Sequence, residues 1–222
     1  MAKTVKTIFV ENDLNSFKDY HDKKWFKDAS DLVVGTTMEP VFNKFAPHWW
    51  GSARAFILPW LLVNGAYDGV NSVVPTRRSR QDIWNDYIAL AGFQGGLWKL
   101  AESMFCTIYY AYENLIVNCL IEIKQTQIRV TDGQFNKMLI DVYGDKVANK
   151  IWNGSFVSVS REIRNCIVHN GGKSSTNLLK MKPLPDIKNG DILISASDTR
   201  NLYEKLKPLV SDILIHSLEK IK

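Results

Sequence analysis

The sequence predicts an all-α protein: a helical bundle that carries one small β-hairpin late in the chain. Three observations support this fold class. Residues 97–123 are apolar on nearly every side of a helix, residues 156–170 place apolar and polar side chains at helical spacing, and Asn189-Gly190 separates two short apolar stretches. A helix without a polar face belongs at the centre of a bundle, and Asn-Gly between apolar stretches is a strong signal for a tight hairpin.

The first part of the chain is uneven. Residues 1–80 predict an N-terminal extension, mostly helical or irregular, that packs on a bundle formed by residues 81–222. Within the extension we expect a charged helix near residues 13–28, followed by a loop rich in Trp and Pro. Residues 53–67 are the most apolar stretch; they contain Pro59 and are too short to span a bilayer, so a buried helix is expected there.

The rest of the chain is predominantly helical. Glycines should break or bend a helix just before residue 97, and residues 133–152 predict one or two shorter helices. The helix at 156–170 should end at Gly171-Gly172, where a C-cap is expected. A final helix should follow Asp198 and be interrupted by Pro208. The glycines before residue 97 are Gly92, Gly95 and Gly96.

The helix at 156–170 has an unusual polar face. At 100° per residue its apolar residues fall within one arc that faces the core. The opposite arc contains several polar residues with two valines between them, which favours a surface covered by a second copy of the chain. Lone exposed valines are common and would explain the same pattern. The residues of this arc are Val157, Arg161, Arg164, Asn165, Val168 and His169.

Charge and cysteine usage restrict the class of protein. The formal net charge is +5 and the isoelectric point about 9.0, which favours phosphate-bearing partners, although a solvated basic surface explains the charge equally well. Cys106, Cys119 and Cys166 lie far apart in apolar helical segments, which is typical of reduced core thiols and argues against a disulfide framework or a zinc site. The N-terminus has no long apolar core of a signal peptide. We therefore expect a cytoplasmic protein that does not associate with membranes.

The polar residues near the end of helix 156–170 have the chemistry for phosphodiester cleavage without a metal or cofactor. His169 lies in the last turn and can donate or accept a proton near neutral pH. Arg164 is permanently charged and can bind two phosphate oxygens. Asn165 precedes His169 by four residues and shares its face, so it can orient the imidazole. From spacing alone, a helix-terminal histidine beside surface arginines is the plainer alternative.

These residues resemble the motif of the HEPN superfamily, helical-bundle proteins found among prokaryotic toxins, phage-defence effectors and other RNA-cleaving systems. The motif is Arg, a polar residue, three further residues and His, and here it runs from Arg164 to His169. Arg-x4-His alone is a weak signal. The context is more specific, because Glu162 precedes the motif, Asn170-Gly171-Gly172 follows it, and the hairpin and last helix come where many family members have them. The resemblance covers residues 95–222.

The resemblance implies an all-α, HEPN-like bundle and a metal-independent endoribonuclease whose two protomers bring both motif helices to one cleft. His169 would activate the ribose 2′-OH or protonate the leaving 5′-oxygen, and Arg164 would stabilise the phosphorane. The products would carry 2′,3′-cyclic phosphate ends. RNA, a second copy of the chain and a cognate antitoxin or regulatory protein are the implied partners, with Arg161 and Lys173 as weaker candidates for substrate contacts. The alternative is a module of the same fold that binds RNA or protein without cleaving; such members often lack the Arg or the His, and this chain has both.

Glu113 is expected to complete the site. Its neighbours one helical turn away are apolar or aromatic, so its carboxylate is costly unless it is paired. Family members often have an acidic residue on this long helix, and Arg164 is the expected partner; an exposed Glu113, or a pair with another base, is the alternative. The four neighbours are Tyr109, Tyr110, Ile116 and Val117.

Other signals are weaker. Cys166 falls on the core-facing arc, which argues against a thiol nucleophile, and the remaining histidines do not cluster as metal ligands would. Residues 76–80 (TRRSR) suit an RNA backbone or a solvated linker, the latter being favoured. Trp49-Trp50 suits base stacking or core packing, and core packing is favoured because the chain has seven tryptophans.

Overall fold

The structure, a computed structural model, describes residues 23–68 and 91–221. The regular secondary structure in these ranges is helical apart from one two-stranded hairpin near the C-terminal helix, so the predicted all-α fold with a late hairpin is confirmed. The elements in chain order are α3 (Lys23–Val33), α4 (Glu39–Asp68), α6 (Ala91–Lys124), α7 (Phe135–Ala148), the π-helix η2 (Asn149–Asn153), α8 (Ser155–His169), the 3-10 helix η3 (Leu178–Lys180), β1 (Asp186–Lys188), β2 (Asp191–Leu193) and α9 (Ala196–Ile221).

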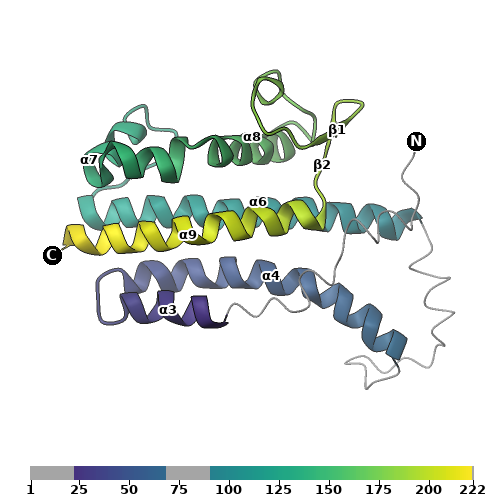
Figure 1. Cartoon of the computed structure of the whole chain (residues 1–222), viewed down its shortest axis with the longest axis horizontal. Coiled ribbons are helices and arrows are strands. Elements are labelled where there is room, and N and C mark those ends of the chain that lie inside the picture. The colour runs from purple at the N-terminus through teal and green to yellow at the C-terminus, as the bar shows by residue number, and fades with distance from the viewer. Residues whose placement is uncertain (1–22, 69–90, 222) are drawn as a thin grey trace.

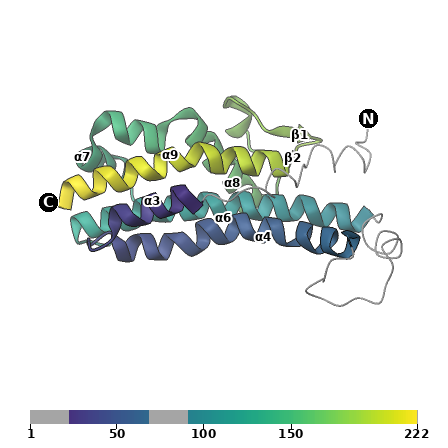
Figure 2. The ribbon, with the colours of Figure 1, turned by 60° about the horizontal axis from the view of Figure 1, so that its bottom comes forward.

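Helix α6 lies at the centre of the bundle, as its sequence predicts. In Figures 1 and 2, α3 and α4 lie on one side of it, α7 and α8 on the other, and α9 runs alongside. One buried apolar cluster joins side chains from all of these helices. The stretch Trp98–Lys124 is long and apolar enough to cross a membrane by length and composition, but its place in the middle of the bundle is typical of the core helix of a soluble protein.

The prediction of a loop rich in Trp and Pro is wrong, because the residues that carry these side chains are helical in α4. Pro40 occupies the first turn of α4, where a missing N–H costs nothing. The residues that follow place Phe42, Phe45 and Trp49 at helical spacing, and all three are buried. Trp49 packs on Tyr203 of α9 with 4.4 Å between ring centroids, so core packing rather than base stacking explains it. This aromatic burial outweighs the poor helix propensity of the prolines.

The expected helices upstream of α6 are partly outside the described residues. Of the charged helix near residues 13–28, the structure describes only the part from Lys23, which is helical. The backbone of residues 53–67 is helical, as expected, within α4. The break expected before residue 97 is wrong, because α6 begins at Ala91 and continues through its glycines. A glycine lowers helix stability by about 1 kcal/mol, a cost that a long packed helix can absorb.

The end of α8 agrees with its predicted cap. Gly171 and Gly172 have φ angles of 59° and 83°, the left-handed region that favours glycine. The amides of Asn170 and Gly172 both donate to the carbonyl oxygen of Cys166 at 3.0 Å. Upstream, one or two shorter helices are expected within 133–152, and the structure has α7, which is kinked at Gly144, and η2.

The hairpin and the last helix also follow local sequence signals. Asn189 (φ 53°) and Gly190 (φ 83°) form the turn between Lys188 and Asp191, as a type I′ turn requires. Helix α9 then begins at Ala196, two residues before Asp198, because the Asp198 carboxylate accepts the Ser195 amide at 2.8 Å in a reciprocal capping box. The predicted interruption at Pro208 does not occur, since α9 continues through it to Ile221.

Candidate functional site

The central contact of the candidate site joins α6 to α8. Arg164 Nη2 donates to Glu113 Oε1 at 2.6 Å, which confirms the pairing expected from the sequence. The two side chains are only 18% and 13% exposed, so water screens the pair weakly. Glu113 lies beside the buried Tyr109 and Ile116 of α6, where a carboxylate is costly unless a cation such as Arg164 pairs with it.

Two side chains of α6, the aromatic Tyr109 and the thiol Cys106, lie near Arg164. Its Cζ atom is 5.7 Å from the centre of the Tyr109 ring. Burial raises the pKa of the Cys106 thiol to about 11, although the nearby Arg164 charge lowers it. Cys106 is therefore a neutral thiol near pH 7. Cys166 of α8 is completely buried, which agrees with its place on the core-facing arc.

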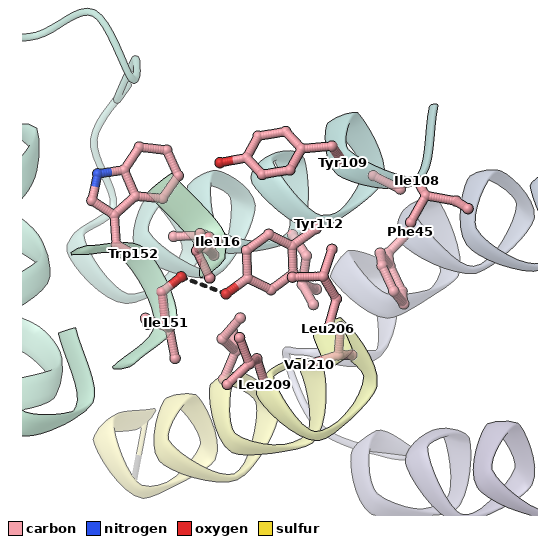
Figure 3. Packing of buried hydrophobic residues seen from close by; sticks show 14 of the residues in the cluster. Phe45, Ile108, Tyr109, Tyr112, Ile116, Ile151, Trp152, Leu206, Leu209 and Val210 are labelled. Atoms are coloured by element: carbon pink, nitrogen blue, oxygen red, sulfur yellow. Dashed lines mark hydrogen bonds between the residues drawn. The ribbon is translucent and has the colours of Figure 1, made fainter. Parts of the chain in front are cut away.

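Arg161 lies one turn before Arg164 and rests on a different surface. Its Cζ atom is 4.3 Å from the centre of the Trp152 ring, and its Nη1 donates to the Trp152 carbonyl oxygen over a long 3.4 Å. Figure 3 shows the Tyr109 hydroxyl directed toward the Trp152 ring, while Tyr112 donates to the carbonyl of Ile151 and so fastens η2 to α6. The arginines, Trp152 and Tyr109 thus gather where α6, α8 and η2 meet.

The Tyr109 hydroxyl is unusual for a buried group. Burial raises the pKa of Tyr109 well above its usual value, and the Arg161 charge opposes this shift. No hydrogen bond of normal geometry reaches the hydroxyl from the described residues, and the same is true of Arg164 Nε. Buried polar groups without partners are rare in folded proteins.

His169 lies at the other end of the site. It is exposed in the last turn of α8, and within the described ranges no hydrogen bond or ion pair engages its imidazole. Asn165 is half-buried on a neighbouring part of the helix surface. Five residues along an α-helix correspond to a rotation of about 140°, so Arg164 and His169 of one chain point in different directions.

The prediction for one residue of the outer arc of α8 is wrong, because Val157 does not lie on the exposed surface. Val157 is 1% exposed, whereas Val168 is 55% exposed. The two valines lie on the same side of α8 but about 16 Å apart along it. The N-terminal part of α8 packs into the core together with Trp152 and Ile151 of η2, and this cover ends before Val168. A helical wheel cannot detect such a change, because it treats every position at one angle alike.

The segment after His169 is tied to the hairpin. The Gly172 carbonyl accepts the Ile192 amide at 2.9 Å, and Lys173 pairs with Asp191 at 2.6 Å. Lys173 is therefore partly neutralised at the hairpin. Glu162 accepts the Ser175 hydroxyl at 2.5 Å, which holds the loop that follows.

Trp152 and Tyr109 are the site residues that the sequence did not indicate as functional. Trp152 precedes Arg161 by nine residues and comes from a separate helix, so no helical spacing connects them. Tyr109 could be recognised only as an apolar-side neighbour of Glu113. Their common location depends on the packing of α6, α8 and η2, which a single sequence does not display.

Among the residues described, no group of three or more His, Cys, Asp and Glu side chains is arranged to hold a metal ion. Comparison with models of protein families, with characterised proteins and with solved structures gave no significant match to this chain. The resemblance to the HEPN superfamily therefore rests on the motif residues Arg164 to His169 and on their sequence context.

Proposed function

We propose that this protein is a metal-independent endoribonuclease whose active site is completed by a second copy of the chain. The observation that carries the proposal is the Glu113–Arg164 pair. It fixes one nitrogen of a permanently charged guanidinium at the junction of α6 and α8, and it leaves other N–H groups of Arg164 able to bind a phosphate oxygen. His169 is exposed in the same helix, so its imidazole is open to a substrate and to proton exchange with water.

In the proposed reaction, a neutral His169 takes the proton of a ribose 2′-OH. The 2′-oxygen then attacks the adjacent phosphorus, and the bond from phosphorus to the 5′-oxygen breaks. The 5′-oxygen receives a proton from a protonated histidine, and the other product has a 2′,3′-cyclic phosphate. Arg164 stabilises the added negative charge of the phosphorane.

The angular separation within α8 is the reason to propose a composite site. Since Arg164 and His169 of one chain point about 140° apart, one chain alone does not place both on one phosphate. Two α8 helices related by a two-fold axis would bring Arg164 and His169 of both chains to one cleft. The exposed Val168 beside His169 suits an apolar contact between the two helices.

The direct test is incubation of the purified chain with total RNA in EDTA. We expect cleavage with 2′,3′-cyclic phosphate ends and its loss in His169→Ala. His216→Ala is a matched control, because His216 pairs with the surface residue Glu219 near the end of α9 and should not affect cleavage. Equal cleavage by wild type and His169→Ala would refute the proposed chemistry.

The second candidate is a module that binds RNA or a partner protein without cleaving it. It is favoured by the same 140° separation, and by the fact that one nitrogen of Arg164 is already engaged by Glu113. In the RNA assay this function predicts intact RNA together with a shift in RNA mobility. His169→Ala would then leave the shift unchanged.

The proposal extends to the cellular setting. Cys106, Cys119 and Cys166 are all free thiols, which suits a reducing compartment such as the cytoplasm. A toxin or phage-defence role, with an antitoxin or regulatory protein as partner, is implied by the motif resemblance alone. Expression of wild type and His169→Ala in a bacterial host tests it, since only the wild type should slow growth.

A further inference from the structure

Charge is unbalanced where α8 meets α6. Arg161 and Arg164 are one helical turn apart, a spacing at which side chains are neighbours and like charges repel. Glu113 offsets one of the two charges. Glu162, also on α8, lies on a different side of the helix and is engaged by Ser175. Within the described residues, the junction therefore carries an excess positive charge in a partly buried position.

Several hydrogen-bonding groups at this junction are also unused. Arg161 lies over the Trp152 ring, with its Cζ atom 4.3 Å from the ring centre, and the hydrogen bond that it donates to the Trp152 carbonyl oxygen is long. A guanidinium has five N–H groups, so Arg161 has further donors for a planar or tetrahedral anion. Close by, Arg164 Nε is buried without a partner, and the Tyr109 hydroxyl, which lies near the Arg161 side chain, makes no hydrogen bond of normal geometry. Unsatisfied donors around an excess positive charge are what an oxyanion would satisfy.

We infer that Arg161 and Arg164 together bind one phosphate group, with Trp152 holding Arg161 in position and the Tyr109 hydroxyl beneath. Arg161 would be a binding residue and Trp152 a positioning residue. The inference rests on the proposed function only for the source of the phosphate, which would be the RNA backbone. Inorganic phosphate contains the same oxyanion, so binding can be measured without RNA.

The experiment measures phosphate binding to the full chain by calorimetry, and thermal stability in phosphate against chloride at equal ionic strength. We expect wild type to be stabilised specifically by phosphate, and Arg161→Gln to bind it about tenfold more weakly or worse. Arg129→Gln is the matched control, because Arg129 is an exposed arginine on the loop before α7. Arg161→Lys keeps the charge but lacks the planar fork, and it should also bind more weakly.

The outcomes separate this inference from the proposed function. No phosphate-specific effect in wild type, or equal binding by wild type and Arg161→Gln, would overturn the phosphate site. If Arg161→Gln fails to fold, Arg161→Lys decides in the same way. Phosphate binding that survives in His169→Ala supports the site even if the RNA assay shows no cleavage. Cleavage that depends on His169 but not on Arg161, with no phosphate binding, would leave the nuclease and remove the site.

Discussion

Glu113 of α6 and Arg164 of α8 are 51 residues apart in sequence, yet they form a 2.6 Å charge-assisted hydrogen bond with little exposure to solvent. A carboxylate in an apolar stripe of a central helix needs a cation, and the α8 arginine supplies it. The pair therefore ties the candidate site to the core of the bundle. Any change to it should alter both stability and the position of Arg164.

The strength of this coupling can be measured by a double-mutant cycle. We expect Glu113→Gln, Arg164→Gln and the double variant to give a coupling free energy of about 1–3 kcal/mol from urea unfolding. The pair Lys99–Glu102 is a suitable control, because its lysine is 71% exposed. There the coupling should be about 0.5 kcal/mol or less. Equal couplings in the two cycles would contradict the view that burial strengthens the α6–α8 pair.

Tyr112 is expected to be a structural anchor of the site. Its side chain is completely buried, and its hydroxyl donates to the Ile151 carbonyl in η2, next to Trp152. Tyr112→Phe removes a buried hydrogen bond to that carbonyl, so we expect a loss of about 1–3 kcal/mol in the free energy of unfolding. Tyr110→Phe, at a side chain 51% exposed, should change it by less than about 0.5 kcal/mol. A Tyr112→Phe variant as stable as wild type would show that the contact contributes nothing.

Alkaline pH should weaken the fold partly through Cys106. Burial raises the pKa of its thiol from 9.0 to about 11 in the folded chain. Between these values the unfolded chain has lost the thiol proton and the folded chain has kept it, so stability falls as pH rises through this window. The contribution is complete below pH 9. We expect Cys106→Ala to lose less stability than wild type between pH 8.5 and pH 10.5 in urea unfolding; an identical loss would place the alkaline sensitivity in other groups.

The features that the sequence predicted correctly depend on local chemistry or on one unavoidable pairing. The Asn189-Gly190 turn and the Gly171-Gly172 cap need left-handed backbone that few residues adopt. Glu113 needs a cation, and Arg164 of the motif is the basic residue that the sequence offers for it. Each of these inferences required only neighbouring residues or a single charge balance.

The features that were missed depend on tertiary packing. The prolines of α4 argued for a loop, but Phe45 and Trp49 bury against the other helices and stabilise the helix. The spacing of these aromatic residues was the signal available. A helical wheel places Val157 on the outer arc because it has no axial coordinate, whereas packing near the start of α8 buries this residue. The contact of Arg161 with Trp152 requires the placement of η2, which no periodicity indicates.

The last prediction concerns assembly. We expect a homodimer in which two α8 helices approach each other through the surface around Val168 and His169, since that end of α8 is uncovered and apolar at Val168. Light scattering at micromolar concentration should give twice the chain mass of 25.3 kDa. Val168→Lys should shift the protein toward monomer and reduce RNA cleavage in parallel, because a charge in an apolar contact is costly.

Val34→Lys is the matched control: Val34 is 60% exposed on the loop after α3, so the same substitution there should leave the dimer intact. A wild-type monomer, or a dimer unaffected by Val168→Lys, would contradict this interface, and a monomer that still binds RNA without cutting it would favour the binding module.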